Sequence, residues 1–226
     1  MASRLVIGVT LVVIAKAPVA GQAKTRLGAT VGHDAAADIA AATLLDTLDA
    51  VDATPVQARV VSLTGDLDRA SSGDEIRSRL ADLPVVEQRG DDFSARLANA
   101  IADAAAVAGA RPVLLIASDT PQVTADLLTE CAQALVETDV VFGLARDGGW
   151  WVLGVTEPSM ADCLHTIPTS RADTGPATLE ALRDKGLAVT LVAELSDVDT
   201  IDDVELVRAD CAPDSRFARA TRAAGI

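Results

Sequence analysis

Three cations gather in a short stretch of an otherwise acidic chain, where they could bind phosphate. Lys16, Lys24 and Arg26 lie within residues 15–27, together with Gly21. Gly21 would let the backbone approach a ligand closely, and the cations would neutralise phosphate oxygens. The glycine spacing matches neither a Walker A loop nor a dinucleotide-binding fingerprint. The stretch is therefore either a phosphate-binding loop or a solvated turn with scattered charges.

Two carboxylates later in the chain could bind a divalent cation beside such phosphates. Asp119, in Ser118-Asp-Thr-Pro121, directly follows an apolar run, and Asp199 lies in the acidic stretch 197–203. Carboxylates are typical protein ligands of Mg²⁺, and they also suit Mn²⁺. Each aspartate has a structural alternative, because Asp119 could bond local turn amides and Asp199 or Thr200 could cap a helix.

A third carboxylate stands beside the only two tryptophans, in Asp147-Gly-Gly-Trp-Trp151. Side chains alternate along a strand, so one tryptophan would face a site and could pack on a base or sugar ring. We take Trp150 as that residue, with Gly148 and Gly149 as a backbone that can approach substrate. The alternative is that both rings pack in or around the core and the glycines only build a turn.

Weaker candidates for substrate contact are Gln88, Arg96 and Ser170, which lie in polar stretches where surface charge is the alternative. His33 and His165 are isolated, and neither has a serine or cysteine partner in the sequence. The sequence therefore gives no support to a hydrolase triad.

The elements that must position these residues alternate between strand and helix. We expect strands at 5–14, 56–63, 84–87, 112–117, 139–144, 150–155 and 187–193. We expect helices at 34–50 with Asp34 as cap, 66–80 with a break near 71–73, 91–108, 124–136, 178–185, 201–208 and beyond Pro213. This order predicts an α/β fold with three α/β/α layers around a mostly parallel sheet, in one domain spanning 1–226. Ligands of such sheets bind at the carboxyl ends of the strands, where all the charged motifs would meet.

Composition narrows the function classes. The 226 residues carry a net charge of −14 and no broad basic stripe, which argues against nucleic-acid partners and anionic membranes. The three cysteines are widely spaced, which is typical of a reducing cytoplasm. Arg4 and the following apolar run also resemble a secretory signal, but Lys16 closes that run and favours a first strand.

Taken together, the motifs resemble a bacterial family of glycosyltransferase-like proteins with a GT-A fold and poorly defined activity. The resemblance runs in order through 15–27, 88–96, Ser118-Asp-Thr-Pro121, Asp147-Gly-Gly-Trp-Trp151, 167–170 and Asp197-Val-Asp-Thr200. The chain departs from the family pattern at Thr120 in place of Cys, at the tryptophan pair in place of a tyrosine pair, and at Thr169 in place of Trp.

The wider relatives that this resemblance implies are guanylyltransferases of molybdenum-cofactor and phospholactate metabolism and sugar-acid cytidylyltransferases. By that resemblance, Lys16, Lys24 and Arg26 would bind the phosphates of a nucleotide, and Asp119 and Asp199 would hold Mg²⁺ or Mn²⁺. We expect nucleotidyl transfer from a nucleoside triphosphate to a small acceptor. The alternatives are glycosyl transfer from a nucleotide-sugar, with Asp147 as base, and a non-catalytic protein that binds nucleotides or nucleotide-sugars.

Overall fold

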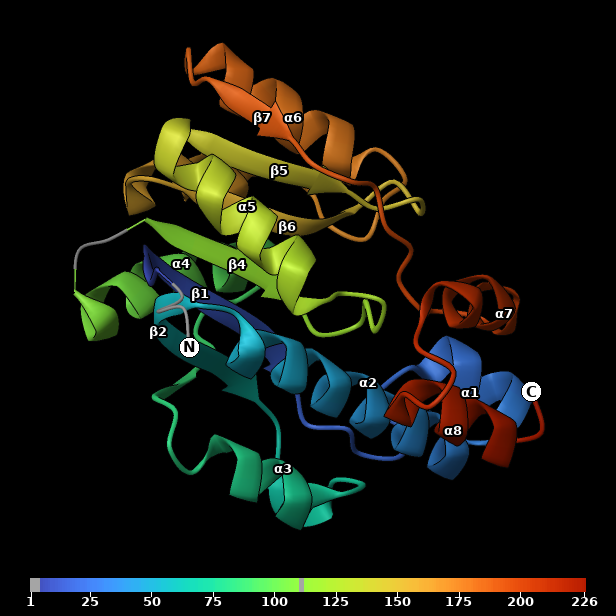
Figure 1. Cartoon of the computed structure of the whole chain (residues 1–226). Coiled ribbons are helices and arrows are strands. Elements are labelled where there is room, and N and C mark those ends of the chain that lie inside the picture. Colours follow the sequence, from blue (N-terminus) through green and yellow to red (C-terminus); the bar gives the residue numbers. More distant parts are fainter. Residues whose placement is uncertain (1–4, 110–111) are drawn as a thin grey trace.

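A seven-stranded sheet forms the middle of the molecule. The computed structural model describes residues 5–109 and 112–226. In this part of the chain the strand order is β3-β2-β1-β4-β6-β5-β7 (Figure 1). The strands are β1 (Ile7–Lys16), β2 (Val56–Thr64), β3 (Val85–Glu87), β4 (Val113–Ala117), β5 (Val140–Leu144), β6 (Trp150–Val155) and β7 (Val189–Leu191). β6 runs antiparallel to β4 and β5, and every other neighbouring pair is parallel.

Helices cover both faces of this sheet. They are α1 (Thr25–Val31), α2 (His33–Ala53), α3 (Gly73–Leu80), α4 (Phe93–Ala108), α5 (Ala125–Glu137), α6 (Thr174–Asp184), α7 (Ile201–Asp210) and α8 (Arg216–Ala223), with 3₁₀ segments η1 (Leu67–Arg69) and η2 (Pro158–Thr166). The core under one face contains residues of α2, α3 and α5, and the core under the other contains residues of α4, η2 and α6. The fold is therefore the expected three-layer α/β/α arrangement.

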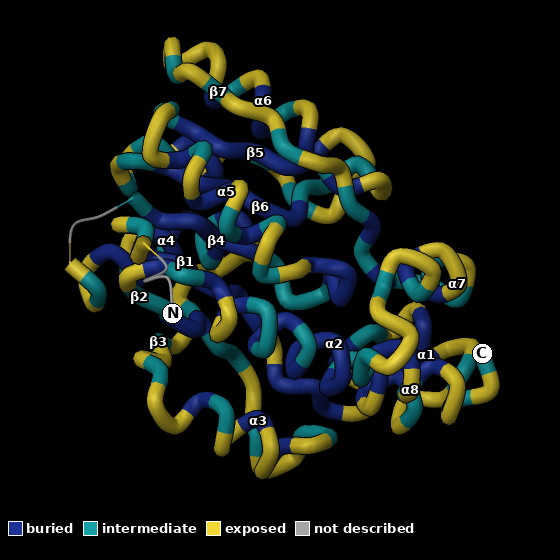
Figure 2. Tube along the Cα trace, viewed as in Figure 1, coloured by how far each residue is buried: buried dark blue, intermediate teal, exposed yellow. Residues whose placement is uncertain are grey.

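The alternation of side chains along β1 explains these two cores. Val9, Leu11 and Val13 point to the α2 and α5 side, whereas Val12 and Ile14 point to the α4 side, and all five are at most 5% exposed. Both faces of a central strand are buried in such a fold, so the strand reads as a continuous apolar run. Figure 2 shows this burial across the middle strands of the sheet.

A third, smaller core lies beyond the carboxyl ends of the strands. It joins α1 and α2 to α7 and α8 through Leu27, Ile39, Val207 and Phe217 (Figure 1). Arg216 adds ion pairs from α8 to Asp49 of α2 and Glu75 of α3. These contacts hold α8 against α2 and α3.

Several expected boundaries are wrong. β1 starts at Ile7 and extends to Lys16, because Leu5 and Val6 lie in solvent and the sheet pairs Lys16 with Thr64. β7 is confined to Val189–Leu191, the length over which β5 offers it a partner. Arg4, which belonged to the alternative of a secretory signal, lies outside the described residues.

The helices differ from expectation at several of their starts, and α4 begins at Phe93, two residues later than expected, because Asp92 is its N-cap. The stretch 15–27 is not a loop throughout, since Arg26 and Leu27 belong to α1. α2 is capped by Gly32 and not by Asp34, which lies in the first turn, where the helix dipole favours an acid. α6 begins at Thr174, four residues earlier than expected, because Pro176 is tolerated in a first helical turn. No helix in the described part of the chain combines the length and the apolar character that a membrane span requires.

Candidate functional site

The loop after β1 places Lys24 at the start of a helix. Lys24 is the N-cap of α1 and has a left-handed backbone, with φ of 45°. The buried side chains of Ala23 and Leu27 anchor both sides of this turn. Lys16 Nζ donates to the carbonyl of Gln22 at 2.8 Å and so closes the loop upon itself. Gly21 adopts a φ of 74°, as a tight turn requires.

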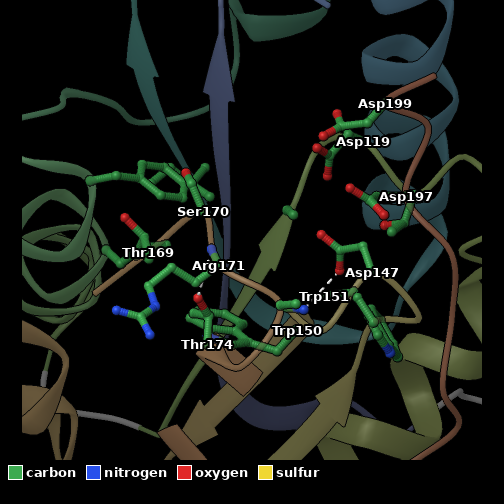
Figure 3. Close-up of a pocket in the computed structure, with 18 of the residues that line it drawn as sticks. Asp119, Asp147, Trp150, Trp151, Thr169, Ser170, Arg171, Thr174, Asp197 and Asp199 are labelled. Atoms are coloured by element: carbon green, nitrogen blue, oxygen red, sulfur yellow. Dashed lines mark hydrogen bonds between the residues drawn. The ribbon is translucent and has the colours of Figure 1, made fainter. Parts of the chain in front are cut away.

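A main-chain hydrogen bond brings two distant acidic segments together. The amide of Val198 donates to the carbonyl of Asp119 at 3.3 Å, and the Val198 side chain is fully buried. In an extended segment the neighbours of a buried residue point the opposite way, so Asp197 and Asp199 turn toward Asp119. Oxygens of these three carboxylates lie within 4.8 Å of one another, and Figure 3 shows them at one side of a pocket.

Lys24 bridges two of these carboxylates. Its Nζ atom lies 3.1 Å from Asp119 Oδ2 and 3.1 Å from Asp199 Oδ1, and Arg26 lies 3.3 Å from Asp199. Burial alone would lower the pKa of Lys24, but the attraction of the two aspartates outweighs it and raises that pKa. Thr200 caps α7, and Asp203 accepts a hydrogen bond from its amide at 2.7 Å. The carboxylate of Asp199 is therefore not used as the cap.

Asp197 is the carboxyl group of the cluster with the largest change in acidity. Burial raises the pKa of Asp197 to about 7, and the negative charges of Asp119, Asp147 and Asp199 add to the effect, while Lys24 opposes it. A carboxyl group of this kind can exchange a proton near neutral pH.

A tight turn between β5 and β6 holds the remaining carboxylate. Asp147 Oδ1 accepts a hydrogen bond from the amide of Gly149 at 2.8 Å. Gly148 has a φ of 91°, and its carbonyl accepts a hydrogen bond from the amide of Gly175 at 2.7 Å. The following tryptophans face opposite ways, as strand alternation requires, and both contribute to the lining of a pocket: Trp150 is half-buried there, whereas Trp151 is only 1% exposed.

Two cavities meet at this cluster. The first, which we call the basic pocket, measures about 280 Å³ and is lined by Lys16, Gln22, Lys24, Thr25 and Ser118. The second, the large pocket, measures about 600 Å³ and is lined by Phe93, Thr120, Asp147, Trp150, Thr169, Ser170, Arg171 and Asp197 (Figure 3). Arg26, Asp119 and Asp199 line both cavities and form the border between them.

Four of the candidates, Gln88, Arg96, Gly21 and Gly148, lie outside the lining of both cavities. Gln88 donates from Nε2 to the carbonyls of Ala15 and Ser62, at 2.8 and 2.9 Å, and so links the ends of β1 and β2. Arg96 Nε donates to the carbonyl of Gly90 at 3.3 Å, and Gly21 shapes the loop.

Sequence reasoning missed some of the residues that line the large pocket. Phe93 is 48% exposed at the first turn of α4, and Thr120 is buried at the pocket wall. No sequence pattern distinguishes such a phenylalanine from a core residue. The Asp-x-Asp spacing of 197 and 199 does contain a signal, because residues two apart in an extended segment share a side.

Solved structures of the same fold include one described as a nucleotide-diphospho-sugar transferase, a synthetase with bound CTP and a manganese complex. A provisional nucleotide-diphospho-sugar transferase from Desulfovibrio desulfuricans G20 is 26% identical, with a TM-score of 0.82 over 95% of this chain and 94% of its own. A CMP:2-keto-3-deoxy-manno-octonic acid synthetase complexed with CTP is 12% identical, with a TM-score of 0.54 over 89% and 97%. A protein of Mycobacterium tuberculosis H37Rv in complex with manganese is 20% identical, with a TM-score of 0.54 over 88% and 97%.

The chain therefore has the fold of the nucleotide-diphospho-sugar transferases. The DUF2064 family, described as an uncharacterized protein conserved in bacteria, matches residues 47–171, and the chain belongs to it. The curated proteins include no significant match.

Proposed function

We propose that this chain is a divalent-metal-dependent transferase that acts on a nucleotide, with the whole site in one domain. The observation that carries the proposal is the position of Lys24, which comes from the loop after β1 and contacts both Asp119 and Asp199. Cations suited to phosphate and carboxylates suited to a metal thus share one border between two pockets.

The donor set fits a hard divalent ion. Asp119, Asp197 and Asp199 offer carboxylate oxygens within 4.8 Å of one another, which suits Mg²⁺ or Mn²⁺. The manganese complex of a protein with this fold supports that choice. When bound, such an ion would neutralise phosphate oxygens. Lys16, Lys24 and Arg26 would bind the phosphates in the basic pocket.

Nucleotidyl transfer is the first form of this function. The acceptor would attack the α-phosphorus of a nucleoside triphosphate, the bond to the β-phosphate would break, and pyrophosphate would leave with its electron pair. The cations around the basic pocket would stabilise the charge on the pyrophosphate, and such a reaction needs no protein nucleophile.

Glycosyl transfer is a second candidate, and the position of Asp147 favours it. Asp147 lines the large pocket and is oriented there by its hydrogen bond from Gly149. A carboxylate so placed could take the proton from an acceptor hydroxyl as that oxygen attacks the sugar of a nucleotide-sugar. The cations of the basic pocket would then stabilise the departing nucleoside diphosphate.

We place either reaction in the cytoplasm, because Cys131, Cys163 and Cys211 are all free thiols.

Product analysis tests this function. Purified protein with Mg²⁺ and a panel of nucleoside triphosphates and acceptors should release pyrophosphate, whereas cleavage of a nucleotide-sugar without pyrophosphate would select glycosyl transfer. Nucleotide binding without any product across both panels would contradict a transferase and leave a binding protein.

Asp119→Asn tests the assigned metal site. It should abolish Mg²⁺-dependent nucleotide binding at a cost in folding stability below about 2 kcal/mol, because Lys24 keeps its contact with Asp199. The matched control is Asp202→Asn, which removes the same charge from an exposed position in the first turn of α7. Normal nucleotide affinity in Asp119→Asn would show that Asp119 is only structural.

A further inference from the structure

The charges around the large pocket leave no free cation for an anionic acceptor. Five aspartates line it, and the only two described cations in the lining, Arg26 and Arg171, both have acidic partners. Arg26 lies 3.3 Å from Asp199, and Arg171 lies 2.9 Å from Asp173. In Figure 3 the guanidinium of Arg171 also points away from the aspartates labelled there. Lys24 and Arg26 compensate Asp119 and Asp199, but no cation in the described part of the chain pairs with Asp147, so a phosphate or carboxylate entering here would meet the negative charge of that side chain.

The rest of the lining suits hydroxyl groups and an apolar face. Thr120 is 1% exposed, lines the pocket, and its hydroxyl has no hydrogen-bond partner within the described residues. A buried hydroxyl of this kind is costly unless a ligand or water completes its hydrogen bonding. Apolar groups line the same pocket, among them the rings of Trp150 and the half-exposed Phe93. Flat apolar rings beside hydroxyls and carboxylates are typical of sites that bind polyols.

We propose that the large pocket binds an uncharged or cationic acceptor that carries hydroxyl groups, in preference to a phosphate or carboxylate acceptor. This inference rests on the proposed transferase function and names the substrate class of its second pocket. It holds for either transferred group, because both reactions release their anionic leaving group into the basic pocket.

The chemical step balances with groups already in the site. The acceptor oxygen forms a bond to the sugar carbon or to the α-phosphorus, and its proton passes to Asp147. The bond from that centre to the leaving phosphate oxygen breaks, and its electron pair leaves with the nucleoside diphosphate or the pyrophosphate. An acceptor hydroxyl has such a proton to give, whereas an ionised phosphate or carboxylate has none.

The sign of the charge in the pocket can be measured through Trp150. The chain has two tryptophans and no tyrosine, and Trp151 is 1% exposed, so collisional quenching of the emission reports on Trp150. Trp151→Phe removes the buried fluorophore and leaves Trp150 as the only tryptophan. If that variant fails to fold, the fraction of the natural protein's emission that quenchers can reach reports on Trp150 instead. Quenching by iodide, caesium and acrylamide is compared with that of free N-acetyltryptophanamide at constant ionic strength.

Caesium should quench Trp150 more efficiently, relative to iodide, than it quenches the free fluorophore. The quantity compared is the ratio of the caesium quenching constant to the iodide quenching constant. One uncompensated charge about 7 Å away in water changes the local concentration of a monovalent ion about threefold, so the caesium-to-iodide ratio should exceed that of the free fluorophore by at least about threefold. Asp147→Asn should lower this ratio, and Asp214→Asn, outside the pocket, should not. A ratio equal to or below that of the free fluorophore overturns the proposal.

Three probes with the same ring and different charge complete the test. Emission of Trp150 is titrated with glucosamine, methyl glucoside and glucuronate. Tighter binding of the first two supports the proposal, whereas preference for glucuronate, or binding by none of the three, overturns it. Neither metal nor nucleotide is present, so failure here is distinguishable from failure of the nucleotide-binding and product assays.

Discussion

Replacing Lys24 with methionine should change the affinities for metal and for nucleotide in opposite directions. In the structure its ammonium group contacts Asp119 and Asp199, two of the three carboxylates of the proposed metal site. A divalent ion must displace that group before it can bind there. The displaced ammonium would then be available to the phosphates of the nucleotide.

The size of the effect follows from the two contacts. At 3.1 Å and an effective dielectric constant of about 20, each pair attracts by about 5 kcal/mol before solvation is counted. The aspartate side chains are 36% and 37% exposed, so water screens most of this attraction. A net value of about 1–2 kcal/mol for both contacts together remains, which is about 5- to 30-fold in affinity.

Titration with Mn²⁺, followed by the electron paramagnetic resonance of the free ion, measures this directly. Lys24→Met should bind Mn²⁺ about 5- to 30-fold more tightly without nucleotide, yet bind the metal–nucleotide complex more weakly. The matched control is Lys16→Met, because Lys16 bonds the carbonyl of Gln22 and not the aspartates. That variant should lose nucleotide affinity without gaining metal affinity. Unchanged or weaker Mn²⁺ binding by Lys24→Met would refute the reasoning.

Two further predictions concern stability. The pKa of Asp197 is raised from an unfolded value near 4 to about 7, so proton binding stabilises the folded state most below about pH 4, and that contribution is lost as the pH rises to about 7. Urea unfolding should therefore show the natural protein losing stability relative to Asp197→Asn between about pH 4 and pH 7, and a gain would contradict the sign. Gly148→Ala would place Cβ 1.9 Å from the carbonyl oxygen of Ala172 at a φ of 91°, and should cost about 3 kcal/mol or more. The control Gly186→Ala, at a φ of 77° with nothing within 4 Å, should cost only about 1–2 kcal/mol, and equal losses would show that the turn relaxes freely.

The layers of the fold were predictable because apolar periodicity is a local property. The apolar run of β1 and the Thr124 cap of α5 depend only on residues that are adjacent in the sequence, and both were expected. The helix α1 was not, since it has only 7 residues and begins at a lysine with a left-handed backbone. Its existence depends on Leu27 packing against α2 and α8, which is a property of the assembled core.

The site was predictable in its members and not in its contacts. Topology alone indicated that the residues after β1, β4, β5 and β7 would meet at one edge. The sequence could not show that Lys24 neutralises Asp119 and Asp199, because a lysine in this loop is equally suited to bind a phosphate or to pair with a carboxylate. Nor could it show the raised pKa of Asp197, which arises from burial and from the charges of three distant aspartates.

The separation of 175 residues between Lys24 and Asp199 has a consequence for biosynthesis. A ribosome delivers the cationic loop first, and the carboxylate that pairs with it emerges 175 residues later. Until then the nascent chain exposes an unneutralised cluster of positive charge, open to any soluble polyanion. Emergence of Asp199 and docking of α8 onto α2 would close that window.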